Sequence, residues 1–292
     1  MGNGDGQMDM PDEHDRLVAI GHHLQSIVEA AKRLRRRQGD RVMSVDSQAH
    51  NEVQNWAASD NETTPLTEAH FQGLKALLAA EDFCSASVDM AGRPDRSFST
   101  MTVLRGAAEA SAKAFWYLDP SIGADERAAR AIGGLQVAVG SAKRFGRKAR
   151  IEFGEDVSAD IDALDAVIRK HPGGATTPPN WEQLLRGIGR TMQLEDRVSD
   201  AGLESLSNAA HSMKDARDQI IIGWEEDGSP ILQTHRASEW GYWYVANIFA
   251  AAVSHAAELL GWDDEQWLRE ATASTEELQK LFNTVKAERT RR

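Results

Sequence analysis

The stretch that decides the fold is residues 97–118, SFSTMTVLRGAAEASAKAFWYL, the clearest amphipathic helix in the chain. When its residues are placed 100° apart, the small and apolar side chains gather on one face. That face holds Val103, Leu104, Ala107, Ala108, Ala110, Ser111, Ala114, Phe115 and Leu118. The opposite ridge carries Arg105, Glu109 and Lys113 at four-residue steps, which permits ion pairs within the helix. A helix of this kind buries its apolar face against other helices, so the pattern favours a helical bundle.

Trp116 falls on the polar ridge of this helix, where a solvent-facing helix would not usually place an indole. Either another element of the fold covers Trp116, or its side chain contacts a partner. Together with Glu109, Trp116 is therefore a candidate ligand-binding residue.

Apolar residues at helical spacing predict further helices on both sides of this one. The predicted helices cover 13–37, 67 to the break at Gly92, 124–145, 181–188, 199–222, 238–260 and 264–286, with an apolar stripe at 161–168. No run of alternating β-branched residues stands out, and there is no internal repeat of fixed period. The predicted architecture is an all-α, multi-helix bundle of about seven to nine helices.

The same reading divides the chain into four parts. Residues 1–12 form a disordered tail, and 13–64 form an N-terminal helix followed by a polar linker, because 42–65 are polar and poorly periodic. Residues 65–286 form the main helical bundle, and 287–292 form a basic tail.

Composition excludes several classes of protein. Hydrophobic residues make up 41% of the 292, which is enough to build a core. The formal net charge of −12 favours a soluble cytoplasmic protein and argues against tight, nonspecific binding of a polyphosphate. The single cysteine, Cys84, excludes an internal disulfide and is expected to be a buried, inert thiol.

No secretory or membrane-crossing segment is predicted. The N-terminus has neither the basic start nor the apolar run of a signal peptide. The most apolar stretch, 240–261, contains Asn247, Ser254, His255 and Glu258, which a membrane span would not accommodate. We expect this stretch to be a buried central helix.

Four aromatic residues stand within five positions of that stretch. Trp240, Tyr242, Trp243 and Tyr244 must point in different directions around a helix, so some lie in the core and others reach another surface. Core packing is one interpretation. The other is a self-association interface formed by Trp240, Trp243 and Tyr244, because Trp and Tyr are enriched at protein interfaces.

A basic run, Lys32-Arg-Leu-Arg-Arg-Arg37, ends the first predicted helix. Basic residues in a last helical turn suit the helix dipole, so this run can be a solvated helix end. The alternative is contact with a nucleic acid or another anionic partner. No aromatic residue is interleaved among the arginines, which weakens a role in stacking on single strands.

One polar cluster has catalytic potential. On the helix predicted over 199–222, a single side carries Glu204, Ser207, His211, Asp215 and Asp218. Asp215 stands one turn from His211 and could orient its imidazole and favour the charged form, and Ser207 stands one turn in the other direction. No nucleophile elbow surrounds Ser207, so a serine-hydrolase triad is not indicated.

Three interpretations of this cluster stay open. It can be a solvated acidic face with one histidine, a binding or catalytic site, or a metal site using Glu204, His211 and Asp215. No His-Glu-x-x-His or phosphate-loop pattern is present, so neither a metal nor a cofactor is predicted.

Three short stretches carry a family resemblance: 104–120 (LRGAAEASAKAFWYLDP), 203–212 (LESLSNAAHS) and 256–262 (AAELLGW). They resemble a broad group of actinobacterial all-helical proteins of unassigned role. That group is similar to the HEPN superfamily, which includes abortive-infection proteins and toxin ribonucleases. The resemblance covers roughly residues 65–265.

The resemblance implies a helical bundle that dimerises. HEPN nucleases cut RNA without metal, with an Arg separated from a His by four to six residues. His211 matches the histidine, but the three positions for the arginine hold Glu204, Ser205 and Leu206, so the motif is degenerate. Arg105, on a neighbouring helix, is the candidate substitute.

The resemblance and the residues together give the expected function. The chain is expected to be a HEPN-like protein of a defence or stress module that binds RNA or a protein partner. The alternatives are a non-catalytic, dimerising regulatory module and a metal- or ligand-binding bundle. Whether the chain is an enzyme stays open. If it is one, the resemblance implies a metal-independent ribonuclease. No signature of DNA binding is found.

Overall fold

The computed structural model describes residues 13–39, 42–58, 64–93, 96–152, 158–170, 174–191, 206, 221–224, 230–232 and 235–291. This part of the chain contains nine helices and one short hairpin, which confirms the predicted all-α bundle. The helices are α1 (Glu13–Arg37), α2 (Gln48–Ala58), α3 (Thr64–Val88), α4 (Ser97–Tyr117), α5 (Ala124–Glu152), α6 (Ser158–Lys170), α7 (Trp181–Thr191), α10 (His235–Leu260) and α11 (Glu265–Arg291).

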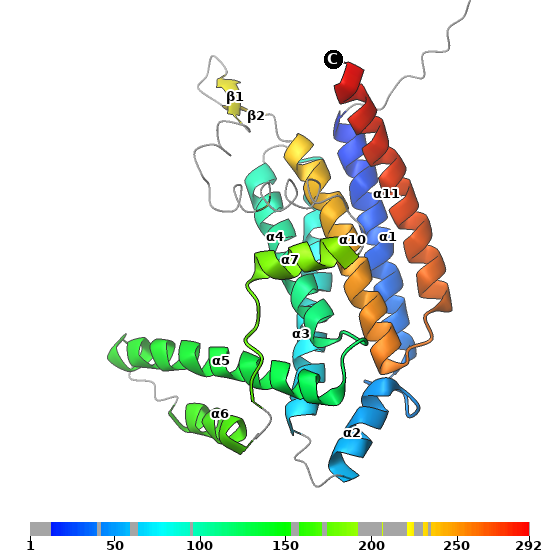
Figure 1. Ribbon diagram of the computed structural model, residues 1–292. Helices are drawn as coiled ribbons and strands as arrows, with labels where there is room; N and C mark the ends of the chain where they lie inside the picture. The colour runs from blue at the N-terminus through cyan, green and yellow to red at the C-terminus, as the bar shows by residue number, and fades with distance from the viewer. Residues whose placement is uncertain are drawn as a thin grey trace, which may run out of the picture.

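Five long helices form the bundle, and the others are attached to it. Helix α10 packs against α1 and α4, α3 packs against α4, and α11 runs beside α1 (Figure 1). Helix α7 crosses over α4 and α10, and α5 lies across the end of the bundle with α6 beside it. Helix α2 sits at that same end.

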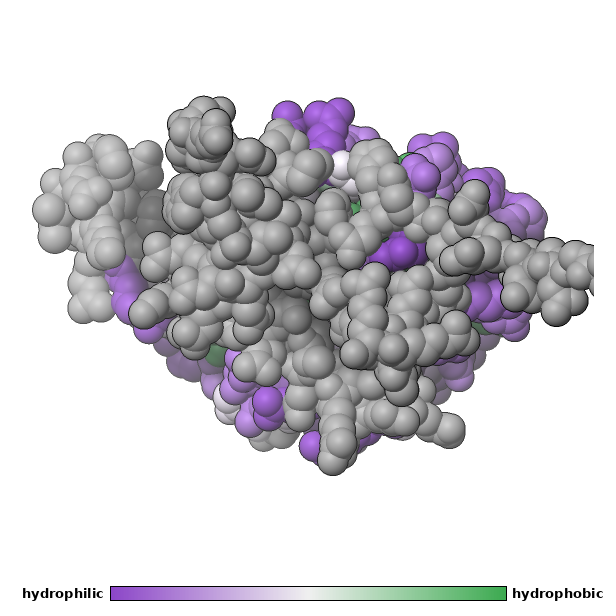
Figure 2. Space-filling view, turned by 90° about the horizontal axis from the view of Figure 1, so that it is seen from above, coloured by the Kyte–Doolittle hydropathy of each residue, from purple (hydrophilic) through white to green (hydrophobic). Residues whose placement is uncertain are grey.

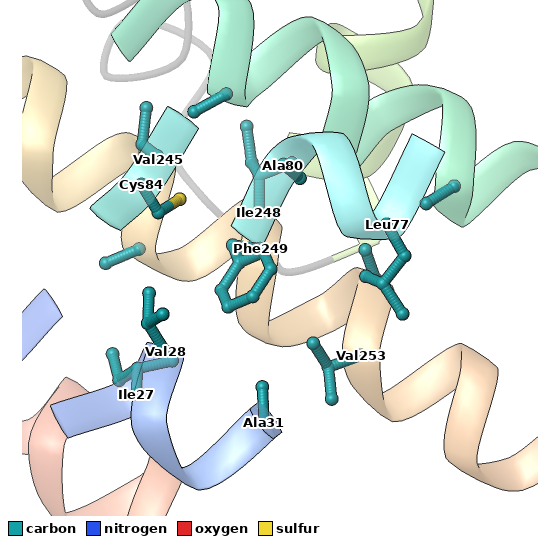
Figure 3. Close-up of a cluster of buried hydrophobic side chains, with 14 of the residues drawn as sticks. Ile27, Val28, Ala31, Leu77, Ala80, Cys84, Val245, Ile248, Phe249 and Val253 are labelled. Atoms are coloured by element: carbon teal, nitrogen blue, oxygen red, sulfur yellow. The ribbon is translucent and has the colours of Figure 1, made fainter. Parts of the chain in front are cut away.

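The core lies where α1, α3 and α10 meet. Figure 3 shows side chains from these three helices pointing toward one another: Ile27, Val28, Ala31, Leu77, Ala80, Cys84, Val245, Ile248, Phe249 and Val253. Full burial of a large aliphatic or aromatic side chain contributes about 1.5–3 kcal/mol. Cys84 is fully buried, as expected, and burial raises the pKa of its thiol.

The segment predicted to be an extension belongs to the bundle. Leu24 and Ile27 of α1 are fully buried in the same core as α3 and α10, so no boundary at residue 64 separates α1 from the other helices. The polar stretch predicted to be a linker contains helix α2. It was missed because α2 is short and buries only Ala49 and Trp56.

A hairpin replaces the end of one predicted helix. Strand β1 (Ile221–Trp224) pairs antiparallel with β2 (Pro230–Leu232), with Trp224 opposite Pro230. The prediction of a helix over 199–222 is therefore wrong at Ile221 and Ile222. β-branched isoleucines suit an extended strand, and pairing with a second strand overrides a helical period this short.

Two helix ends follow signals that can be read from the sequence. Gly261 ends α10 with φ +66°, and the N–H of Trp262 donates to the carbonyl of Ala257 at 2.9 Å. This is a Schellman cap, in which glycine is favoured because it adopts a positive φ without steric cost. Asn180 and Gln183 form a reciprocal capping box at the start of α7, where the backbone N–H of Gln183 donates to Asn180 Oδ1 at 2.8 Å.

Two observations concern the polarity of one face of the molecule and the apolar content of its described helices. Seen from above, the described residues in view are mainly hydrophilic (Figure 2). Within the described ranges, no helix combines the length and the apolar content needed to cross a bilayer.

Close packing fixes the loop before α7 on α5. The N–H of Thr176 donates to the carbonyl of Ala129 at 2.9 Å, which brings the loop backbone onto Gly133. A Cβ on Gly133 would lie 1.9 Å from the carbonyl oxygen of Thr176, so no side chain fits there.

The substitution Gly133→Ala should therefore lower the free energy of unfolding by about 1–3 kcal/mol, because the loop must move away. Gly140→Ala on the same helix is the matched control, since nothing lies within 4 Å of its Cβ. It should raise stability by about 1 kcal/mol through helix propensity. Urea denaturation of both variants checks this, and equal shifts in the two would contradict it.

Candidate functional site

The predicted catalytic cluster lies outside the described residues. This applies to Glu204, Ser207, His211, Asp215 and Asp218. Leu206 is described, and it is helical and fully buried. A methyl group on Gly241 of α10 would lie 3.1 Å from Leu104 Cδ1 and 3.3 Å from Leu206 Cδ2. Leu206 is thus anchored beside α4, next to the helical turn that carries Arg105.

Arg105 is held by two neighbours. Its Nε donates to Glu109 Oε1 at 2.8 Å, which confirms the ion pair that the four-residue spacing permits. Its guanidinium carbon lies 4.6 Å from the centre of the Trp181 ring at the start of α7. A guanidinium over an indole is a favourable cation–π contact. Arg105 and Glu109 therefore anchor α7 on α4.

Trp116 is covered by α5. The guanidinium of Arg130 lies 5.1 Å from the centre of the Trp116 ring, and the indole is almost fully buried. Of the two explanations for Trp116, the structure shows the first, in which another element covers it. It does not offer the indole to a ligand.

The aromatic residues of α10 face inward. Tyr244 is 0% and Trp243 4% exposed, and the Trp243 indole N–H donates to Gln279 Oε1 of α11 at 3.2 Å. Trp240 is half-buried and meets the Trp243 ring edge-on. The interface interpretation is thus corrected for Trp243 and Tyr244, because α7 and α11 already occupy the surfaces that a partner would need.

The basic run at the end of α1 is used inside the chain. Arg35 donates to Glu81 Oε1 of α3 at 2.9 Å, and Lys32 donates to Glu29 Oε1 at 2.9 Å. Arg33 pairs with Glu270 of α11. These contacts hold α1 between α3 and α11, and they pair three of the five cations of the run with carboxylates.

A buried polar corner, which the sequence did not predict, lies where α4 turns into α5. Arg127 of α5 is 0% exposed, and its Nε donates to Glu52 Oε2 of α2 at 2.9 Å. Its other nitrogens donate to the carbonyls of Tyr117, Asp119 and Ile122, each at 3.0 Å. The last carbonyls of a helix lack partners within the helix, and here a guanidinium donates to that of Tyr117 and to two carbonyls of the turn that follows α4.

Two neighbours complete this corner. Gln48 of α2 donates to the carbonyl of Pro120 at 3.0 Å and to Glu52 Oε1 at 2.9 Å. Arg130 donates to the carbonyl of Trp116 and to Glu126 Oε1. Positive charge at the carboxyl end of α4 also interacts favourably with the negative end of its helix dipole.

His70 of α3 lies beside the Arg127–Glu52 pair. Its side chain is buried, and neither ring nitrogen has a hydrogen-bond partner in the described structure. Burial and, to a smaller extent, the nearby Arg127 charge lower the pKa of His70 to about 4, while Glu52 acts in the opposite direction. An unpartnered buried imidazole next to an ion pair is a group that needs an explanation.

Sequence reasoning missed this corner because its members are far apart in the chain. Glu52, His70 and Arg127 belong to three helices, and none stands in a motif. The sequence held only a weak signal for this corner. Arg127 lies at the end of the first turn of a predicted helix and is followed directly by two alanines, Ala128 and Ala129. A cation inside an apolar helix face indicates a buried partner.

Helix α3 presents an unusual outer ridge to solvent. Its residues Thr67, Phe71, Lys75, Leu78 and Asp82 recur at three- and four-residue steps, and all five are exposed. Phe71 is 55% and Leu78 44% exposed, and the Lys75 ammonium lies 5.3 Å from the centre of the Phe71 ring. This ridge joins two large apolar side chains to one cation and one anion.

No group of three or more metal-ligating side chains occurs in the described ranges. Comparisons of the chain with family models, with curated proteins and with solved structures find no match.

The geometry of the corner predicts a large effect for Arg127→Met. The substitution removes the Arg127 hydrogen bonds to the carbonyls of Tyr117, Asp119 and Ile122 and leaves the Glu52 carboxylate without its cation, so stability should fall by about 3–5 kcal/mol. Arg269→Ala, in an exposed pair with Glu265, should change stability by under about 1 kcal/mol. Urea denaturation measures both, and a difference below about 1 kcal/mol would contradict the role of Arg127.

Proposed function

We propose that this chain is a cytoplasmic, self-associating interaction module with a HEPN-like bundle, in which the outer ridge of α3 is the contact surface. The observation that carries this proposal is the exposure of Phe71 and Leu78 on one line of a helix whose other sides are packed in the bundle. Removing such side chains from water favours association. Trp243 and Tyr244 of α10 are buried in the core, so they do not offer the surface for a dimer.

The order of charges along the ridge supports a second copy of the chain as the partner. A two-fold axis pairs residue i of one copy with residue j of the other, and the reverse. Lys75 lies three residues before Leu78, and Asp82 lies four residues after it. When two α3 helices run antiparallel with Leu78 near the axis, Lys75 of each copy faces Asp82 of the other. The ridge is therefore complementary to itself in both charge and apolar character.

The ridge spans 16 residues, and its two ends lie about 22 Å apart along the helix. A contact of this length along one helix is smaller than a standard protein interface, so the dimer should be reversible and depend on concentration. This sets the method of the test, because a single measurement at low concentration would miss the dimer.

Sedimentation velocity over a wide concentration range should show a monomer–dimer equilibrium for the wild type. Leu78→Asp should abolish the dimer, because it places two carboxylates at the centre of the contact. Leu268→Asp on α11 is the matched control, since Leu268 is also 44% exposed, and it should leave the equilibrium unchanged. A wild type that stays monomeric at every concentration would refute the proposal, as would equal effects of the two substitutions.

A charge reversal distinguishes this antiparallel arrangement from nonspecific hydrophobic association. Lys75→Asp should weaken the dimer, and Lys75→Asp combined with Asp82→Lys should restore it, because the pair is then reversed in both copies. Failure of the double variant to recover would exclude the antiparallel register.

A second candidate function is HEPN-like binding of RNA. It is favoured by the position of Leu206, which stands five residues before His211 in the sequence and lies with Leu104, the neighbour of Arg105, against Gly241 of α10. The acidic net charge and the internal pairing of the basic run count against it.

An RNA-cleavage and RNA-binding assay with chelator present tests this candidate. If it holds, His211→Ala should reduce cleavage by at least about 100-fold, as expected for loss of a general acid or base. Arg105→Ala should weaken binding, while Lys113→Ala, an exposed cation on the same helix, should change little. Wild-type protein that neither binds nor cleaves RNA would remove it.

A further inference from the structure

Helix α2 is joined to the end of the bundle mainly through polar contacts. Glu52 binds Arg127, and Gln48 binds the carbonyl of Pro120. Its apolar contribution is one small side chain in the main core, Ala49, and a small separate cluster, in which Trp56 packs with Leu66 of α3 and Ala128 of α5. Most of the main core comes from α1, α3, α4, α10 and α11. Because α2 buries little apolar surface, its release costs far less than unfolding of the bundle.

His70 stands one turn after Leu66 on α3, on the side that faces α2 and α5. The charges that act on its ring come from both of those helices: Arg127 from α5 and Glu52 from α2. Helix α4 brings Leu118 and Tyr117 to this end of α3. Burial raises the pKa of the Tyr117 phenol, so it stays neutral, and Glu68 of α3 acts on that phenol.

Two further histidines must be considered. His50 lies on α2 itself and is half-buried. His255 of α10 stacks on Phe115 at 3.8 Å, and burial lowers its pKa while Asp119 of the corner acts against this. Any effect of acid on the corner must therefore be assigned by substitution and not by pH alone.

We propose that His70 makes this corner an acid-sensitive latch, in which protonation of its imidazole releases α2 while the rest of the bundle stays packed. A charged imidazole here would be buried beside the Arg127 guanidinium without a hydrogen-bond partner on either nitrogen. Opening the corner exposes the ring to water, which gives both ring nitrogens hydrogen-bond partners and weakens the repulsion between the imidazolium and the Arg127 guanidinium. Glu52, the counter-ion on α2, leaves with the released helix.

The direction of the pH dependence follows from the pKa of His70 in the two states. That pKa is about 4 when the corner is closed and 6.5 when the ring is in water. Closure is therefore fully favoured above pH 6.5 and is weakened as the pH falls toward 4. Between pH 7.5 and pH 5.0 the equilibrium constant for opening should rise by about 30-fold.

Hydrogen exchange of the full chain, followed by mass spectrometry, measures this opening. Rates are corrected for the intrinsic effect of pH and expressed as protection factors. Protection of the amides in α2 should fall about 30-fold from pH 7.5 to pH 5.0, while that of α4 and α10 should change far less. His70→Leu should make the protection of α2 independent of pH over this range.

His70→Gln provides a second variant that cannot titrate, in case leucine disturbs the packing. His50→Gln and His255→Gln are the controls, and both should keep the wild-type loss of protection in α2. The latch is refuted if α2, α4 and α10 lose protection together, since the bundle then unfolds as a whole. It is also refuted if both His70 variants keep the wild-type pH dependence.

Discussion

The buried guanidinium of Arg127 is the contact on which one end of this protein depends. Helix α4 ends at Tyr117 inside the fold, so the carbonyl of Tyr117 needs a donor from outside the helix. Arg127 donates to that carbonyl and to the carbonyls of Asp119 and Ile122 in the following turn, and its remaining charge is balanced by Glu52. One side chain thus joins the end of α4, the following turn, α5 and α2. A smaller donor could not reach all of these groups, because only arginine presents five N–H groups in a fixed plane.

The helical bundle and the corner around Arg127 are therefore stabilised by different forces. The bundle of α1, α3, α4, α10 and α11 is held by apolar burial, which depends little on pH. The corner is held by an ion pair and by hydrogen bonds to carbonyls, with the neutral ring of His70 beside them. Polar contacts of this kind are directional and responsive to protonation, so the corner is the part of the described structure best suited to local change.

The surface shows a similar division of roles. Cations that look available in the sequence, such as Arg33 and Arg35, pair with carboxylates of α11 and α3. The aromatic residues that look suited to an interface are in the core. On the α3 ridge, by contrast, Phe71 and Leu78 are exposed, and Leu78 stands between Lys75 and Asp82, which carry opposite charges. This explains why we place self-association on α3 and not on α10.

Periodicity and capping residues determined the helical class and the bounds of α1 and α4, because these signals are local and act within one or two turns. The ion pair of Arg105 with Glu109 and the inert Cys84 were predictable for the same reason. Helix α2, the hairpin after Ile221 and the corner of Glu52, His70 and Arg127 were not. Each depends on contacts between residues far apart in the chain, and no local pattern encodes which distant carboxylate a buried arginine will meet. Only the tertiary packing decided which charges were paired and which apolar side chains stayed in water.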